Sequence, residues 1–176
     1  MTGPSGVGKS TILRDVLAQT GARFSISVTT RQPRTGEVDH EHYHFVDRPT
    51  FEGMVANGEM LEWAEVFGRL YGTPAAPVLE AIEAGETIVL DVELRGARQV
   101  HAKCPQATFV LIAPPDPDVL RQRLIARGTE DTDAVEQRLA RAKEELDEAQ
   151  ASGLYEHTIT NDELASAVQR LIRIVT

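Results

Sequence analysis

The segment Gly3-Pro-Ser-Gly-Val-Gly-Lys-Ser10 decides the fold class of this chain. It fits the phosphate-loop pattern G-x-x-x-x-G-K-[ST], which follows a strand and opens a helix. Its glycines let backbone N–H groups converge on phosphate oxygens without Cβ clashes. Lys9 supplies a positive charge for the outer phosphates, and Ser10 can bind Mg²⁺, the usual metal of a nucleoside triphosphate. The alternative is a chance glycine turn, but the apolar periodicity of 10–21 predicts the helix that should follow, and this favours nucleotide binding.

Strands and helices alternate over most of the chain. Two nearly continuous apolar runs, 87–92 and 108–115, are typical of buried parallel strands. Helices are predicted at 10–21, 74–84, 116–128, 131–150 and 161–175. This alternation predicts an α/β fold with a doubly wound parallel sheet. Residues 31–75 interrupt it, so we expect a single domain with a core of 1–30 and 76–176 and a small mixed lobe at 31–75.

The region from 23 to 73 carries short β patterns. The β-branched, alternating run 23–30 predicts one strand, and 42–46 predicts an antiparallel strand. The segment 47–59 predicts a short helix with Thr50 as its cap. Residues 60–73 predict two strands joined by a turn.

Charge and composition limit the partners. A net charge of −9 argues against nucleic acid or an acidic membrane surface, so a small anionic ligand needs a local basic pocket. Cys104 is the only cysteine, which excludes an internal disulfide, and we expect it to be a small buried apolar residue. The five histidines show no metal-ligand spacing, so no zinc site is predicted. We find no signal-peptide pattern and no membrane-spanning run, and therefore expect a cytoplasmic protein.

Five stretches, which together extend over nearly the whole chain, resemble guanylate kinase in their order and spacing. They are GPSGVGKST (3–11), SVTTRQPRTGEVDHEHYHFV (27–46), GEMLEWAEVFGRLYGT (58–73), LIAPP (111–115) and LRQRLIARGTEDTDAVEQRLARAKEEL (120–146). The resemblance implies a P-loop kinase that transfers the terminal phosphoryl group of ATP to GMP with Mg²⁺, giving ADP and GDP.

The resemblance also implies a GMP-binding set in and beside the small lobe. Two arginines alone on a polar loop, Arg31 and Arg34, are more often a solvated surface. The resemblance implies that they hold the GMP phosphate together with Tyr43 and Tyr71. Glu37 should support them by pairing with an arginine or a water. Ser27, Glu62 and Thr73 should read the base, and Glu93 stands at the place where the family usually has aspartate. The implied GMP-binding residues are Ser27, Arg31, Arg34, Glu37, Tyr43, Glu62, Tyr71, Thr73 and Glu93.

The choice of Glu62 makes chemical sense independently of the family. Guanine presents two adjacent donors, N1–H and the 2-amino group, and one carboxylate accepts both. Adenine lacks both donors, so Glu62 would face an acceptor and discrimination would be large. The alternative is a solvated carboxylate on a strand.

The ATP side follows from the phosphate loop and from the arginines of a helical lid around 115–145. The implied ATP-binding residues are Gly3, Pro4, Ser5, Gly6, Val7, Gly8, Lys9, Ser10, Thr11 and Asn161. The implied catalytic residues are Lys9, Arg34, Arg123, Arg127 and Arg138, and the metal ligands are Ser10 and Asp91. Arg123 and Arg127 are four apart and share a helix face, whereas Leu120 and Leu124 should point to the core. Each of these residues also has a structural alternative. Asp91 could be a helix cap or a turn acid, and Asn161 a helix N-cap. Arg123, Arg127 and Arg138 could form a surface charge pattern.

Two other functions are compatible with parts of the sequence. A catalytically dead binding module tends to lose the phosphate loop and the lid arginines, and this chain retains both. A related kinase with another phosphorylated acceptor is disfavoured by the full GMP set. The expected partners are ATP and GMP, with neither nucleic acid nor membrane; the sequence does not decide between a monomer and a homo-oligomer.

The phosphate loop begins unusually close to the start of the chain. The family has an apolar strand of about six residues before the loop, whereas only Met1 and Thr2 precede it here. Translation from an upstream start or a trimmed chain is favoured over true absence of the strand. We expect a loop fixed only by its following helix to be poorly ordered, and expect added apolar residues to raise both the melting temperature and the ATP affinity.

Overall fold

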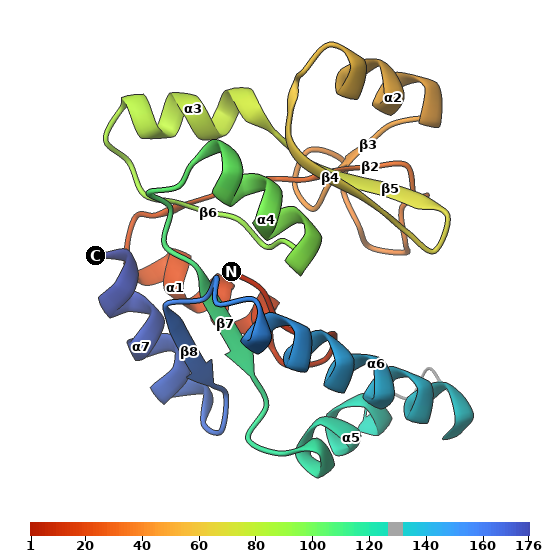
Figure 1. The fold of residues 1–176 in the computed structure, drawn as a ribbon, viewed down its shortest axis with the longest axis vertical. Coiled ribbons are helices and arrows are strands. Elements are labelled where there is room, and N and C mark those ends of the chain that lie inside the picture. The colour runs from red at the N-terminus through yellow and green to blue at the C-terminus, as the bar shows by residue number, and fades with distance from the viewer. Residues whose placement is uncertain (127–131) are drawn as a thin grey trace. The chain divides into compact units, whose positions relative to one another are not determined.

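The computed structural model describes residues 1–126 and 132–176 (Figure 1). They form two compact units, one of 1–21 with 108–176 and one of 22–107. The predicted lobe, 31–75, falls inside the second unit. Among the described residues, no helix has the length and apolar character that a membrane span requires.

The first unit holds the phosphate loop. Its elements are α1 (Lys9–Gln19), β7 (Val110–Ala113), α5 (Pro117–Ala126), α6 (Thr132–Ala151), β8 (His157–Thr160) and α7 (Leu164–Val175). Strand β7 is buried along its whole length and pairs in parallel with β8, which lies beside it in Figure 1. Helix α5 begins where predicted, because the Asp116 carboxylate accepts a hydrogen bond from the N–H of Val119 at 2.8 Å.

The residues before the phosphate loop are tied into this unit. Thr2 forms a parallel bridge to Leu111 of β7. Its N–H donates to the Val110 carbonyl at 2.9 Å, and its carbonyl accepts from the N–H of Ile112 at 2.8 Å. Met1 and Thr2 are both largely buried. The expectation that only the following helix fixes the loop is therefore wrong, because two backbone hydrogen bonds hold its other end.

The second unit contains a mixed sheet with the order β3-β2-β5-β4 and a separate parallel pair, β1 with β6. Its elements are β1 (Arg23–Phe24), β2 (Val28–Thr29), β3 (His44–Phe45), α2 (Arg48–Ala56), β4 (Met60–Val66), β5 (Arg69–Pro74), α3 (Ala75–Glu83), β6 (Ile88–Val89) and α4 (Leu94–Lys103). The mixed sheet and α2 share a small core of Val28, Phe51, Met60 and Leu70. The parallel pairs and their helices agree with the predicted α/β class.

Three local predictions differ from the structure. The run 23–30 is two short strands in different sheets, since β1 pairs with β6 and β2 pairs with β3 and β5. Strand β3 pairs with β2 in parallel, not antiparallel, because residues 30–43 supply the long connection that a parallel pair needs. Helix α2 is capped by Asp47, whose carboxylate accepts from the N–H of Thr50 at 2.8 Å.

Candidate functional site

The phosphate loop has the backbone geometry that its glycines permit. Gly6 and Gly8 have φ of 87° and 102°, in the left-handed region. A Cβ on Gly6 would also lie 2.8 Å from a methyl group of Leu124 on α5. Gly8 stands at the start of α1 and has no side chain to cap it, so a phosphate is the ligand suited to the helix dipole at this end.

Asn161 and Arg123 form hydrogen bonds to the backbone of the phosphate loop. The Asn161 side-chain amide donates to the Val7 carbonyl at 2.7 Å and is buried. The Arg123 guanidinium donates to the Val7 carbonyl at 3.3 Å and to the Asn161 carbonyl at 2.9 Å. Asn161 is thus no helix cap, since the residue before α7 is Glu163. These contacts restrict the loop before any nucleotide arrives.

Two further basic side chains contact the loop. The Lys9 ammonium group donates to the Gly3 carbonyl at 2.5 Å, so it folds back over the loop. Arg138 of α6 donates to the Ser5 hydroxyl. Leu120 and Leu124 are buried, as expected, in a cluster that joins α5 to α6. Arg127 lies outside the described residues.

The second unit gathers an arginine cluster, which we define as Arg31, Arg34 and Glu37. Both oxygens of the Glu37 carboxylate accept from the Arg31 guanidinium, at 2.8 and 2.9 Å. One of them also accepts from the backbone N–H of Arg34 at 2.7 Å. These bonds, Arg31 foremost, lower the pKa of Glu37 to about 2. The expected pairing of Glu37 with an arginine is therefore present.

Aromatic rings surround Arg31. Its guanidinium carbon lies 5.3 Å from the ring centre of Tyr43 and 5.7 Å from that of Phe45. The rings of Tyr43 and Tyr71 meet edge to face, 6.2 Å apart. Burial, then the charge of Asp91, raises the pKa of Tyr43, so its hydroxyl stays protonated and can donate to an anion. The predicted phosphate-binding side chains Arg31, Tyr43 and Tyr71 thus come together.

Glu62 and Thr73 form a buried polar pair between neighbouring strands. They lie opposite each other on β4 and β5, and the Thr73 hydroxyl donates to Glu62 Oε1 at 2.7 Å. Glu62 is 6% exposed. Burial raises the pKa of its carboxyl group, and the charge of Glu93 raises it further. The two oxygens of a buried carboxylate can accept hydrogen bonds from a group with adjacent N–H donors.

Helix α4, which was not predicted from the sequence, supports this pair. The Gln99 amide donates to the Trp63 carbonyl at 2.8 Å and accepts from the Trp63 N–H at 3.2 Å. It thereby satisfies both backbone groups of Trp63 on β4, an edge strand. Gly96 faces Glu62, because a Cβ there would overlap with Glu62 Oε2. No helix was predicted at 94–103, so neither Gly96 nor Gln99 was identified from the sequence as a support of Glu62.

The remaining predicted residues are divided between the units. Ser27 lies beside β2, and its carbonyl accepts from the His44 N–H at 2.9 Å. Asp91 follows β6 and belongs to the second unit, whereas Ser10 is exposed in the first turn of α1 in the first unit. Their joint role as metal ligands stays a prediction.

A cavity of about 520 Å³ lies beside the arginine cluster. Arg31, Phe45, Arg48 and Arg69 line it, but neither Glu62 nor Thr73 does. The cavity therefore does not include the buried Glu62–Thr73 pair, and its size alone does not identify a binding site for a base.

Comparisons with known proteins identify the family of this chain. A family model described as guanylate kinase matches residues 1–176. A guanylate kinase of Symbiobacterium thermophilum is 48% identical over 176 residues, which cover 99% of this chain and 82% of that protein. One from Synechococcus sp. is 46% identical over 172 residues, which cover 97% of this chain and 92% of that protein. The crystal structure of guanylate kinase from Anaplasma phagocytophilum matches with a TM-score of 0.77 at 29% identity and covers 99% of this chain and 81% of that one. The family model spans the chain from end to end and the relatives align over most of their own length, so the chain belongs to the guanylate kinase family and catalyses the ATP-dependent phosphorylation of GMP to GDP.

Proposed function

We propose that the second unit binds GMP through two sets of side chains, the arginine cluster with Tyr43 and Tyr71 for the phosphate and Glu62 with Thr73 for guanine. Guanidinium groups suit a phosphate because their N–H donors match its oxygens. Since Glu37 neutralises Arg31, Arg34 is the residue of the cluster that brings net positive charge to the phosphate. Ser27 and Glu93 are proposed as further contacts to the base.

The Glu62 carboxylate carries the proposal for guanine. Its Oε1 accepts from Thr73, and a carboxylate has lone pairs for further donors. Guanine N1–H and its 2-amino group supply two donors side by side. Adenine would place an acceptor against a buried carboxylate, which costs several kcal/mol. GMP is thereby selected over AMP.

We propose that the phosphate loop, from Gly3 to Thr11, binds the triphosphate of ATP. Lys9 then exchanges its contact with the Gly3 carbonyl for phosphate oxygens. Arg123 and Arg138 already contact this loop and are proposed to stabilise the charge that spreads over the phosphoryl group during transfer. Arg34 and Arg127 complete the proposed catalytic set. Asn161, through its bond to Val7, is proposed to shape the loop beside the adenine.

Mg²⁺ is the metal that fits the proposed ligands. Ser10 offers a hydroxyl beside Lys9, and Asp91 offers a carboxylate after the parallel strand β6, both hard oxygen donors. When bound, Mg²⁺ neutralises charge on the outer phosphates. We propose Ser10 and Asp91 as its holders, directly or through water.

A coupled assay with ATP and a panel of nucleoside monophosphates tests the acceptor assignment. GMP should be phosphorylated fastest, and the reaction should need a divalent cation, with Mg²⁺ effective. Faster turnover of AMP, CMP or UMP would overturn the guanine-reading role of Glu62.

A further inference from the structure

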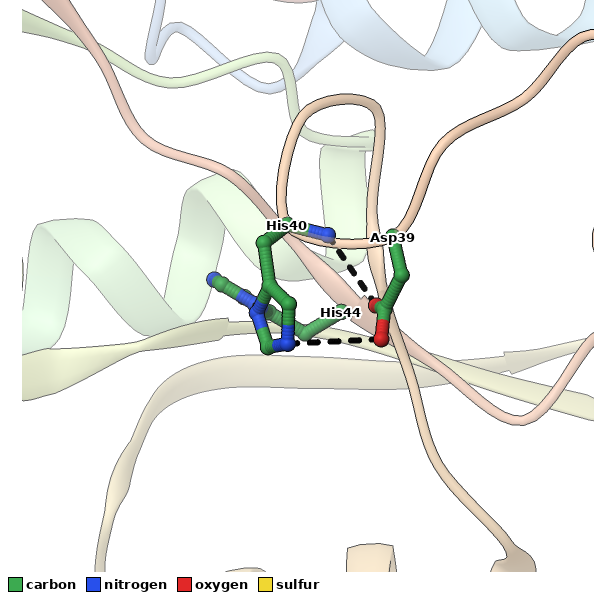
Figure 2. A group of neighbouring side chains, drawn as sticks. All are labelled: Asp39, His40 and His44. Atoms are coloured by element: carbon green, nitrogen blue, oxygen red, sulfur yellow. Dashed lines mark hydrogen bonds and ion pairs between the residues drawn. The ribbon is translucent and has the colours of Figure 1, made fainter.

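Three side chains between β2 and α2 gather outside the proposed substrate sites: Asp39, His40 and His44 (Figure 2). One possible ligand atom from each lies within 4.8 Å of the others. Figure 2 shows the His40 ring with one nitrogen turned to Asp39 and the other to His44. The spacing of the histidines along the sequence did not predict this group, because it depends on how the loop before β3 closes.

The distance between two nitrogens of the imidazoles is that of a pair of metal ligands. His40 Nδ1 and His44 Nδ1 are 2.8 Å apart. Imidazole nitrogens bind transition metals at about 2.0–2.1 Å, so two of them at adjacent corners of a square or octahedron are about 2.9 Å apart. Tetrahedral zinc needs about 3.3 Å, which a small rotation of either ring supplies. Without a metal, one Nδ1 donates to the other.

Asp39 orients the first imidazole. Its Oδ2 lies 3.3 Å from His40 Nε2. Its Oδ1 accepts from the backbone N–H groups of His40 and Phe45, each at 3.0 Å. A carboxylate on the far nitrogen is the usual outer partner of a metal-binding histidine, since it fixes the ring and the tautomer. With Nε2–H directed at Asp39, the Nδ1 lone pair of His40 faces His44.

The backbone holds the two rings in place. Asp39 and Tyr43 form a bridge, and the His40 N–H donates to the Tyr43 carbonyl at 2.9 Å. His44 lies in β3, paired with Val28. His40 has φ of 65°, a left-handed conformation that glycine adopts without strain. A histidine in this conformation is uncommon, which suggests a role for its side chain.

We propose that His40 and His44 bind a divalent transition metal that prefers imidazole, namely Ni²⁺, Cu²⁺ or Zn²⁺, with Asp39 as the positioning residue. Water fills the remaining coordination positions, because Asp39 and His40 are exposed and His44 is partly so. The site differs in chemistry from the proposed Mg²⁺ site, whose ligands are a hydroxyl and a carboxylate. It rests on the loop geometry and not on the GMP assignment.

Calorimetric titration of the nucleotide-free chain with Ni²⁺, in millimolar Mg²⁺ to occupy the oxygen-rich sites, tests the proposal. One site is expected, and His40→Gly and His44→Ala should each weaken binding at least tenfold. His40→Gly suits the left-handed backbone and should preserve the loop. Asp39→Asn should weaken binding by less than either histidine change.

His42→Ala is the matched control, since His42 Nδ1 accepts from the Val38 N–H at 3.1 Å and lies outside the group. It should change Ni²⁺ affinity less than twofold. Cu²⁺ bound to the chain should show electron-spin coupling to two nitrogens, and to one after His44→Ala. Equal Ni²⁺ affinity in the chain and in His40→Gly with His44→Ala combined, or an equal loss in His42→Ala, would overturn the site.

Discussion

At the scale of single residues, Glu62 combines a function with a cost in stability. Its carboxylate is buried beside Thr73, and burial raises its pKa. An acid whose pKa is higher in the folded state favours folding below the pKa of the unfolded chain, and that contribution is lost as the pH rises toward the folded pKa. At neutral pH the charged form therefore destabilises the free protein, while it is the form that is proposed to accept two donors from guanine.

Glu62→Gln should separate these two effects. Its Oε1 still accepts from Thr73, but its NH₂ group opposes the guanine donors, so kcat/KM for GMP should fall at least tenfold, or about 1.4 kcal/mol. The melting temperature at pH 7 should equal or exceed that of the parent. This difference should shrink toward zero as the pH falls below about 4.3, where the unfolded carboxyl is also neutral. Assays with GMP and melting curves over pH measure both, with Glu65→Gln, an exposed change on β4, as the control. Unchanged use of GMP would mean that the base is read elsewhere.

Glu37 shows the opposite behaviour. Its two bonds to Arg31 lower its pKa to about 2. A lowered pKa contributes stability that is present above the unfolded value and is lost as the pH falls through the folded one. The hydrogen bonds by which Glu37 closes the loop 31–37 should therefore be intact from about pH 5 upward. They should be lost between about pH 4.5 and 2.

NMR titration of the Glu37 side-chain carboxyl carbon measures this pKa directly. It should lie well below the ordinary glutamate value of about 4.3. Arg31→Lys retains the charge but not the two parallel N–H donors, so the pKa of Glu37 should rise toward its ordinary value. A value for Glu37 that does not change in Arg31→Lys would show that the pair does not hold the loop.

At the scale of elements, a side chain of helix α4 forms hydrogen bonds with the edge strand β4 of the mixed sheet. Gln99 bonds both backbone groups of Trp63, the residue after Glu62. The position of the Glu62 carboxylate, which is proposed to read the base, thus depends on a side chain from another element.

Gln99→Leu should remove both bonds without changing the size of the side chain greatly. A loss of about 1–2 kcal/mol is expected, or about 2–8 °C in melting temperature. KM for GMP should rise while KM for ATP changes less, because β4 carries Glu62 whereas the phosphate loop belongs to the other unit. Arg98→Leu, at the exposed neighbouring position of α4, should have neither effect. Equal effects of the two changes would assign the loss to helix α4 in general.

At the scale of the whole molecule, the two substrates have their proposed contacts in different units. The GMP residues, from Ser27 to Glu93, all lie in 22–107. The phosphate loop and Asn161 lie in 1–21 with 108–176. Each unit should therefore respond to its own substrate.

Thermal shifts with single substrates test this division. At 100 times its Kd, either substrate should stabilise the protein by about 2.7 kcal/mol, or about 5–10 °C. Lys9→Ala should lose the shift with MgATP and keep the shift with GMP, and Arg34→Ala should do the reverse. Circular dichroism checks that both variants are folded. Loss of both shifts in either variant would contradict separate binding.

The sequence predicted those parts of the site whose geometry is local. The phosphate loop is one, because φ at Gly6 and Gly8 and the helix that starts at Lys9 depend on adjacent residues. The start of the predicted helix α5 is another, because the Asp116 carboxylate bonds a backbone N–H only three residues further on. The cap of α2 was assigned to Thr50 instead of Asp47 because both are good capping residues, and only the observed helix start distinguishes them.

The sequence by itself thus determined the family, the phosphate loop and the residue types of both proposed substrate sites. Only the tertiary structure decided that 23–30 splits between two sheets, that β3 runs parallel to β2, and that Thr2 bonds to β7. It also brought Gln99 to the edge of β4 and His40 onto His44. The physical reason is that backbone propensity and periodicity describe neighbours along the chain, whereas strand pairing and side-chain clusters depend on which distant segments meet when the loops close.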